Sequence, residues 1–199
     1  VFDYVSPLGN ISDVQLGVPV AINIENGIAA MALAQLSGVR NEEIKTGMAS
    51  FRGVDRRFDF KIKTDKVVYL SDYAHHPEEI KQSILSMRAL YGDKKLTGIF
   101  QPHLYTRTRD FYQEFAESLS LLDEVILTDI YPARELPIEG VSSQLIYDNL
   151  RPDIDKILCT KEEVIDILKK KEIEVLMTLG AGDIENYAPQ ICEILNERC

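Results

Sequence analysis

The sequence predicts an α/β fold, in which a mostly parallel β-sheet carries helices on both faces and follows a short helical segment. From Phe58 onward, short apolar strands alternate with amphipathic helices, which is the order expected of a parallel sheet. The strands are nearly continuous apolar runs, as expected where both faces of a sheet are covered. The residues before Phe58 show a helical pattern instead.

The first part of the chain contains two predicted helices. Residues 26–37 are apolar nearly all round, and Gly38 is well placed to end that helix. A second helix is predicted to be capped by Asn41 and to carry apolar residues at helical spacing. Those apolar residues are Ile44, Met48 and Phe51. A helix that is apolar on all sides needs partners that the polar residues before it do not supply. This part is therefore expected to be the remnant of a preceding domain.

The second part alternates between strands and helices. The predicted strands are Phe58–Lys63, Lys66–Leu70, Leu96–Phe100, Glu124–Thr128, Ile154–Cys159 and Glu174–Leu179. The first two are joined by Thr64-Asp65 and are expected to pair as a hairpin. The predicted helices are Pro77–Tyr91, a segment containing Phe111, Phe115, Leu119 and Leu122, a segment after Thr160 containing Val164, Ile167 and Leu168, and a last one containing Tyr187, Ile191, Ile194 and Leu195. Thr160 and Glu163 form a capping-box pattern.

The composition limits the kinds of function. A formal net charge of −10 argues against a nucleic-acid binder, and no apolar run approaches the roughly 20 residues of a membrane helix. The three cysteines are an odd number without CxxC spacing, which favours a reducing cytoplasm over a disulfide framework or a zinc site. The chain begins without Met or a secretory signal, so we expect it to start partway through a longer protein.

Polar clusters follow four of the predicted strands, and all three histidines lie in them. The clusters are residues 72–77, 101–109, 129–140 and 180–183. Ligands of parallel sheets gather at the carboxyl ends of the strands, so these clusters predict a binding site. In a chain this acidic, an anionic ligand requires a local group of Arg and His side chains.

Two interpretations of the cluster Asp72–Pro77 remain open. Asp72 caps the following helix and His75 and His76 are ordinary loop residues, or Asp72 accepts hydrogen bonds from a ribose while Tyr73 or His75 packs on a base. The adjacent histidines do not indicate a metal site, because neighbours in an extended loop point apart.

The cluster His103–Arg109 is the stronger indication. His103, Arg107 and Arg109 form a donor group suited to a carboxylate or a phosphate. The competing interpretation is that both arginines are solvated or pair with Asp110 and Glu114.

Two further features are less specific. Arg56 and Arg57 are either an exposed basic pair or a phosphate contact at a domain junction. Gly180-Ala181-Gly182 predicts a tight turn that exposes backbone amides ahead of a helix. The complete phosphate-loop pattern is absent from the sequence.

Taken together, these motifs resemble the Mur ligases. The matching runs are Arg-Arg-Phe from residue 56, Asp-Tyr-Ala-His-His-Pro from 72, Phe-Gln-Pro-His-x-Tyr-Thr-Arg-Thr-Arg-Asp from 100, Asp-Ile-Tyr-Pro-Ala-Arg-Glu-x-Pro-Ile from 129 and Gly-Ala-Gly-Asp-Ile from 180. The run 100–110 is similar to the branch that adds L-alanine to UDP-N-acetylmuramate. The resemblance implies that residues 54–199 are a Rossmann-like carboxy-terminal ligase domain and residues 1–53 the end of a central ATPase domain.

The resemblance also implies roles for individual residues. Nucleotide contacts fall on Asn23 at the adenine, Arg57 at the terminal phosphate, Asp72 at the ribose, and Tyr73 and His75 along the nucleotide. The incoming alanine is expected at His103 and Arg107, with Arg109 in support and Gly180, Ala181 and Gly182 at the border of its pocket. Arg57, His103 and Arg107 are the expected catalytic residues. Leu104 departs from the family, in which many members have Arg there.

The implied reaction is amide-bond formation from UDP-N-acetylmuramate, L-alanine and ATP through an acyl phosphate. ATP and Mg²⁺ are the implied cofactors, with the magnesium ligands and the phosphate loop expected in the rest of the same ligase chain. The fragment alone is then expected to be inactive. Two alternatives remain: a stand-alone, non-catalytic module that binds a nucleotide or an amino acid, and a family member with a different amino-acid substrate.

Overall fold

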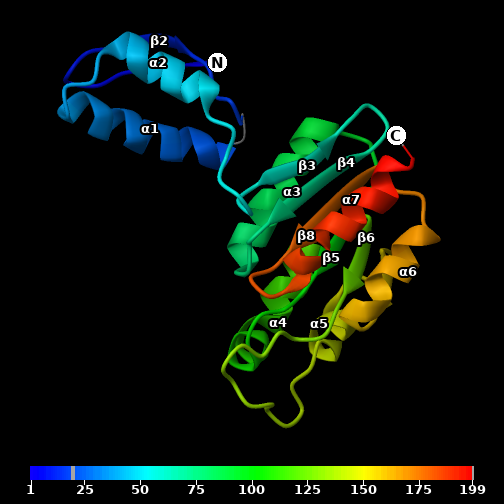
Figure 1. Ribbon diagram of the computed structural model, residues 1–199. Coiled ribbons are helices and arrows are strands. Elements are labelled where there is room, and N and C mark those ends of the chain that lie inside the picture. Colours follow the sequence, from blue (N-terminus) through cyan, green and yellow to red (C-terminus); the bar gives the residue numbers. More distant parts are fainter. Residues whose placement is uncertain (19–20, 199) are drawn as a thin grey trace. The chain divides into compact units, whose positions relative to one another are not determined.

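The computed structural model describes residues 1–18 and 21–198 (Figure 1). The chain forms two compact units, Val1–Val54 and Asp55–Cys199. Of the three cysteines, Cys159 and Cys192 are free thiols, and Cys199 lies outside the described residues. No helix in the described part of the chain has the length and hydropathy needed to cross a membrane.

The first unit combines a two-stranded hairpin with two helices. Strands β1 (Phe2–Tyr4) and β2 (Ile11–Val14) pair antiparallel, and the helices are α1 (Ala21–Leu36) and α2 (Asn41–Ser50). A small core joins all four elements through Tyr4, Ile11, Val14, Met31 and Ile44. The hairpin was not predicted, and it supplies the apolar partners that the polar opening residues seemed to lack.

The ends of these helices differ from the prediction. Helix α1 begins at Ala21 rather than at residue 26. Asn41 is the first helical residue of α2 and not its cap, which is Arg40. The Glu43 carboxylate accepts the Arg40 backbone N–H at 3.1 Å and the Arg40 guanidinium at 2.7 Å. The start of this helix is thus held by Glu43, one turn into the helix, and not by the predicted Asn41 side chain.

Only one apolar side of helix α1 is buried within this unit. Met31 is fully buried, whereas Leu33 and Leu36 are 66% and 71% exposed. The expectation that this helix needs burial on several sides is therefore not met by the first unit alone.

The second unit is built on a six-stranded sheet of order β3-β4-β8-β5-β6-β7. Its strands are β3 (Asp59–Lys63), β4 (Val68–Asp72), β5 (Leu96–Phe100), β6 (Glu124–Leu127), β7 (Asp155–Leu158) and β8 (Val175–Leu179). All neighbours pair parallel except β3 and β4, which form the predicted antiparallel hairpin. The predicted mostly parallel sheet is confirmed.

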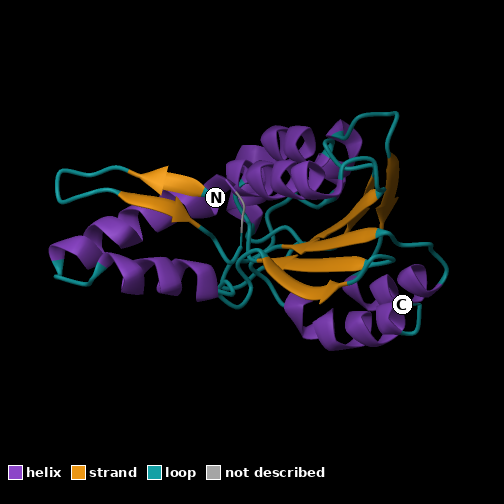
Figure 2. Cartoon of the chain, turned by 90° about the horizontal axis from the view of Figure 1, so that it is seen from above, coloured by secondary structure: helices purple, strands orange, loops and turns teal. Residues whose placement is uncertain are grey.

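Helices cover both faces of this sheet (Figure 2). Helices α3 (Pro77–Tyr91), α4 (Tyr105–Leu119) and α5 (Gln144–Asn149) pack side by side on one face. Helices α6 (Val164–Lys169) and α7 (Ala188–Asn196), each preceded by a 3₁₀ turn (Lys161–Glu163 and Ile184–Tyr187), pack on the other. Side chains alternate between the two faces along each strand. Leu176 therefore packs with α6 and α7, while its neighbours Val175 and Met177 point to the other face of the sheet.

Helix α4 starts earlier than predicted and is interrupted. It begins at Tyr105, and Phe111 has non-helical dihedral angles (φ −128°, ψ 16°) that separate a polar first part from an apolar second part. The second part is held by Phe115 and Leu119, which are 1% and 0% exposed. Leu122 follows the helix and packs on Gly98, where a Cβ atom would lie 2.3 Å from its Cδ1.

The strand ends lie in register along one edge, which we call the carboxyl edge. Asp72 pairs with Leu179, Leu179 with Phe100, and Phe100 with Leu127. The segments that leave these four strands therefore start next to one another. This register brings three of the polar clusters, and the glycine-rich turn after β8, to a single place.

Candidate functional site

A row of aromatic rings runs along the carboxyl edge. The ring centroids of Tyr73 and His75 are 5.2 Å apart, those of His75 and His103 are 6.2 Å apart, and those of His103 and Tyr131 are 5.6 Å apart. The rings come from the segments after β4, β5 and β6. Their faces and edges offer a surface on which a planar group can pack.

Arginines stand over one end of this row. The guanidinium carbon of Arg56 is 4.7 Å from the Tyr73 ring centroid, and that of Arg57 is 5.4 Å away. In the described part of the chain, no carboxylate forms an ion pair with Arg56, Arg57 or Arg107. The other ion pairs of the unit engage lysines, the half-buried Arg88 or exposed arginines, and the His75 ring lies 3.6 Å from the Glu79 carboxylate. Positive charge is therefore concentrated here in spite of the acidic composition.

His103 and Arg107 form a coupled pair at the start of α4. The Arg107 Nη1 lies 3.3 Å from His103 Nδ1. Because arginine stays protonated and only donates, Nδ1 must accept, and the proton of a neutral ring sits on Nε2. Partial burial, with the nearby charge of Arg107, lowers the pKa of His103. His103 thus presents an N–H donor beside the guanidinium, an arrangement suited to a carboxylate.

Arg109 does not join this pair. Arg107 and Arg109 lie in a helix rather than in the predicted loop, and two residues along a helix turn the side chain to the opposite side. The Arg109 Nε donates to Asp110 at 2.7 Å, and its side chain is 52% exposed. The competing interpretation, pairing with Asp110, describes Arg109 but not Arg107.

Asp72 is held by neighbours on its own side of the sheet. Its Oδ2 accepts a hydrogen bond from Ser83 at 2.7 Å and its Oδ1 one from the Ala74 amide at 3.3 Å. Burial raises the pKa of this carboxyl group, against the effect of these donors. Asp72 does not cap α3, whose N-cap residue is His76, and the Glu79 carboxylate accepts the backbone N–H groups of His75 and His76.

The other polar atoms of this segment have a defined orientation. His75 Nδ1 lies 2.9 Å from the Tyr73 carbonyl oxygen, which can only accept, so Nδ1 carries a proton. In the neutral ring, Nε2 is then an acceptor, the opposite of the assignment for His103. The two neighbouring histidines therefore present different hydrogen-bonding atoms to the same site.

The turn Gly180–Asp183 follows β8 as predicted, but its glycines do not have the predicted role. The Gly180 amide donates to the Asp72 carbonyl at 3.2 Å, so this amide is not exposed for a ligand as the sequence suggested. Gly180 has φ +137°, which a side chain would not tolerate easily. The Gly182 carbonyl accepts from Arg56 Nη2 at 3.3 Å. A 3₁₀ turn, rather than a regular helix, follows.

Several residues of this edge were missed from the sequence. Tyr131 stacks on His103, and its backbone bonds to Leu104 and Pro102 at 3.0 and 2.8 Å. The Glu135 carboxylate accepts the Thr106 backbone N–H at 2.9 Å and so caps the start of α4. Their place in the 129–140 cluster that follows β6 was the available signal for both.

The backbone of this edge is strained at non-glycine residues. Four residues in the segments described above have positive φ angles. They are Arg56 at 60°, Phe58 at 49°, Leu104 at 75° and Ala133 at 51°. Such conformations are costly for L-residues and gather where a binding surface requires them.

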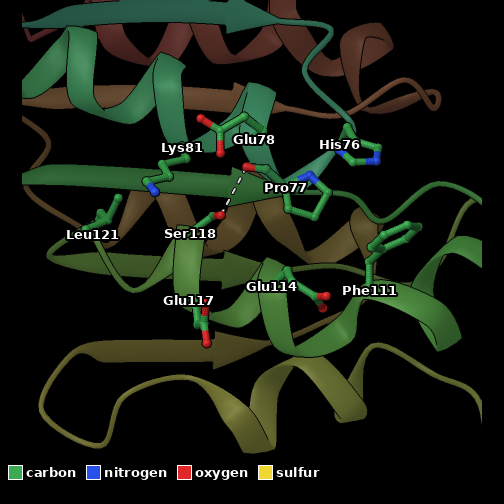
Figure 3. A pocket seen from close by; sticks show the side chains of 9 residues that line it. All are labelled: His76, Pro77, Glu78, Lys81, Phe111, Glu114, Glu117, Ser118 and Leu121. Atoms are coloured by element: carbon green, nitrogen blue, oxygen red, sulfur yellow. Dashed lines mark hydrogen bonds between the residues drawn. The ribbon is translucent and has the colours of Figure 1, made fainter.

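A groove of about 450 Å³ lies next to this site, between α3 and α4 (Figure 3). His76 and Phe111 face one another at one end, with ring centroids 5.0 Å apart. The Ser118 hydroxyl donates to the Pro77 carbonyl at 3.0 Å across its floor. Three glutamates and one lysine line the groove, so its charge does not suit phosphates. These residues are Glu78, Glu114, Glu117 and Lys81.

One residue predicted to bind the nucleotide belongs to the other unit of the chain. Asn23 belongs to the first unit, where its side-chain amide donates to the Val18 carbonyl at 3.2 Å. Among the described residues, no three His, Cys, Asp or Glu side chains are grouped so that they could hold a metal ion.

Comparison with known proteins identifies the family. The family model described as "Mur ligase, glutamate ligase domain" matches residues 56–184, more than half of the chain. The chain belongs to the Mur ligase family. This Mur ligase chain is 79% identical over 197 residues to the UDP-N-acetylmuramate–L-alanine ligase of Phocaeicola vulgatus. It is 51% identical over 199 residues to the enzyme of the same name from Porphyromonas gingivalis ATCC 33277.

The chain spans less than half of these relatives. The alignments cover 99% and 100% of the Mur ligase chain but 43% of each relative. Among solved structures, the UDP-N-acetylmuramate-alanine ligase of Thermotoga maritima aligns with a TM-score of 0.78 and 26% identity, over 94% of this chain and 40% of that one. A murein peptide ligase of Psychrobacter arcticus, at 18% identity and a TM-score of 0.65, shares the fold.

Proposed function

We propose that this Mur ligase chain is the part of a UDP-N-acetylmuramate–L-alanine ligase that binds the nucleotide and the amino acid. The complete protein would join L-alanine to UDP-N-acetylmuramate with ATP, in the cytoplasmic synthesis of peptidoglycan precursors. The observation that carries the proposal is the meeting of the ring row, the three arginines and the strand ends of the carboxyl edge. The named relatives support the same substrate pair.

The amino-acid end of the site is assigned to His103 and Arg107. The two side chains are in contact at 3.3 Å, and a carboxylate can accept N–H groups from such a neighbouring pair. Since Arg107 occupies His103 Nδ1, His103 is assigned the role of a hydrogen-bond donor through Nε2. Arg109 is not needed at this end.

The nucleotide end is assigned to Arg57, Asp72, Tyr73 and His75. The residues present fit such a ligand, because the edge offers a cation for a phosphate, ring surfaces for a base and a half-buried carboxylate for a ribose. The glutamate-lined groove between α3 and α4 offers none of these. Asn23 is assigned to the adenine by family resemblance alone.

The proposed reaction has two steps. A carboxylate oxygen of the muramate attacks the terminal phosphorus of ATP, which releases ADP and leaves an acyl phosphate. The amine of alanine then attacks the acyl carbon, phosphate leaves and the nitrogen loses a proton. The contribution of this chain is to hold the reactants and to offset charge. The Mg²⁺ that accompanies ATP would need ligands from residues outside this chain.

Turnover by the complete protein tests the proposal. We expect release of ADP and phosphate only when UDP-N-acetylmuramate, L-alanine and ATP are all present, and no turnover by the 199-residue chain alone. Equal use of a different amino acid would overturn the substrate assignment. Turnover by the isolated chain would overturn the idea that it is incomplete.

A matched pair of variants tests the site. Arg107→Ala should raise the KM for L-alanine by roughly 10-fold to 150-fold, because it removes a charge-assisted hydrogen bond worth about 1.5–3 kcal/mol. Arg109→Ala removes the same side chain two residues away and should leave the KM nearly unchanged. Affinity for ATP should be similar in both. Equal damage from the two variants would contradict the separation of Arg107 from Arg109.

A further inference from the structure

Gln101 connects the two segments that form the middle of the candidate site. It is 2% exposed and stands between β5 and His103. Its Nε2 donates to Asp183 Oδ1 at 2.7 Å, and its Oε1 accepts the Ile184 amide at 2.9 Å. Both ends of one side-chain amide are therefore used on the turn that follows β8.

The turn is shaped to approach this side chain closely. A Cβ atom on Gly182 would lie 2.2 Å from Gln101 Oε1 and 2.8 Å from the Tyr131 Cβ. A Cβ atom on Gly180 would lie 2.6 Å from the Gln101 carbonyl oxygen. Both glycines are thus required by the contact with Gln101, which gives them a role other than phosphate binding.

The connection continues on both sides of the turn. The second oxygen of the Asp183 carboxylate forms an ion pair with Lys161, which follows β7. The Gly182 carbonyl accepts from Arg56, whose guanidinium lies over Tyr73. A displacement of this turn would therefore shift both the ring row and the segment that carries His103.

We propose that Gln101 is a positioning residue, which fixes the distance between the Gly180–Asp183 turn and the His103–Arg107 pair. It contacts no reacting atom and acts through the turn. The inference rests on the proposed function, in which those two segments border the amino-acid pocket. Loss of the connection should weaken amino-acid binding before it weakens ATP binding, because His103 and Arg107 lie on the same segment as Gln101.

Exchange of the two polar groups tests the contact in the complete protein. Gln101→Glu sets a carboxylate against Asp183 and should raise the KM for L-alanine about tenfold or more, with a smaller change in kcat. The double variant Gln101→Glu, Asp183→Asn restores a donor at residue 183 and keeps the same net charge. It should return the KM to within about threefold of the wild type.

The two single variants complete the cycle. Asp183→Asn keeps the acceptor for Gln101 and should have the smallest effect on the KM for L-alanine. Gln101→Asn is too short to reach both partners, and it serves if Gln101→Glu fails to fold. A lowered unfolding temperature with an unchanged KM in Gln101→Asn and Gln101→Glu would show a structural role only, and would overturn the proposal.

Hydrogen exchange provides a readout that does not need turnover. The Ile184 amide donates to Gln101, so Gln101→Asn should accelerate exchange in the 180–184 segment, while the double variant should not. If the wild-type protein fails to use L-alanine, the proposed function fails and the exchange result still tests the connection. If the wild type uses L-alanine and neither KM nor exchange changes, only the positioning role is overturned.

Discussion

The two edges of the six-stranded sheet use their charged residues differently. At the amino ends of the strands, cations and carboxylates are paired with each other. Arg88 lies 2.8 Å from Asp123, and Glu124 contacts both Lys95 and Lys171. At the carboxyl edge, Arg57 and Arg107 have no such carboxylate among the described residues. A charge whose partner is already in the chain supports the fold, while a charge without one is available to a ligand.

The backbone shows the same contrast. In the described part of the second unit, the residues with positive φ that are not glycine, such as Leu104 and Ala133, lie in the segments at the carboxyl edge. At the opposite edge, the Glu124 side chain is only 3% exposed. Its carboxylate accepts a hydrogen bond from the Thr97 hydroxyl in addition to the two lysine contacts. The costly backbone conformations of this unit thus lie at the carboxyl edge, while Glu124 at the other edge has all its partners within the chain.

The largest expected effect is at the amino edge. Lys171→Met should lower the free energy of unfolding by about 3 kcal/mol, because it leaves the buried Glu124 carboxylate with a weaker set of partners. Denaturant unfolding of the complete protein measures this. The KM values for ATP and L-alanine should not change. Lys95→Met is the matched control, and it should cost less because Lys95 is more exposed and lies farther from Glu124.

The next effect combines both kinds of change at the carboxyl edge. Glu135→Ala removes the cap of α4 and should lower the unfolding temperature by a few degrees. Because Arg107 lies in the first turn of the same helix, the KM for L-alanine should also rise. A lower unfolding temperature with an unchanged KM for L-alanine would show that Glu135 supports only the fold, as the charged residues of the amino edge do.

A smaller effect should reveal the strain directly. Ala133→Gly should raise the free energy of unfolding by about 0.5 kcal/mol, because glycine adopts the positive φ of this exposed position without a steric penalty. The same substitution at Ala89, which is exposed in the last turn of α3, should instead lower the free energy of unfolding, by up to about 1 kcal/mol. Equal signs for the two variants would contradict the presence of strain at Ala133.

The smallest effect concerns pH. Burial and the adjacent Arg107 lower the pKa of His103 below its ordinary value of 6.5, so the unfolded chain binds a proton more readily at this residue. The stability from the neutral ring is complete above the unfolded value and is lost as the pH falls below it. His103→Gln should therefore be less sensitive than the wild type between pH 7 and pH 5. Unfolding measured across that interval, with His76→Gln as control, checks the sign.

The sequence predicted the sheet well because its strands have a simple pattern. Strands such as β5 and β8 are five-residue apolar runs that are buried at every position, so their place could be read without knowing their neighbours. The hairpin of the first unit was missed because β1 and β2 are short and expose polar positions. Helix α5 was missed because only Ile146 of its six residues is buried.

The site was predicted less completely than the sheet. Strand ends identified Asp72, Tyr73 and His103 as neighbours, since register follows from a parallel sheet. The helical start of α4 could not be predicted, because Thr108 is the only buried residue before Phe111 and the cap comes from Glu135, 29 residues from Thr106. Without that helix, spacing alone did not separate Arg107 from Arg109, and only the family resemblance gave Arg109 a supporting role. The role of Gln101 also depends on contacts between distant segments, which spacing alone does not reveal.

The interruption of α4 at Phe111 has an evolutionary consequence. In the proposed site, Arg107 lies in the first helical piece, whereas Phe115 and Leu119, which anchor the helix to the sheet, lie in the second. Substitutions in the first piece can retune which small molecule is recognised while the hydrophobic support stays unaltered. If the proposed site is right, this separation would let a lineage change its substrate without destabilising the domain.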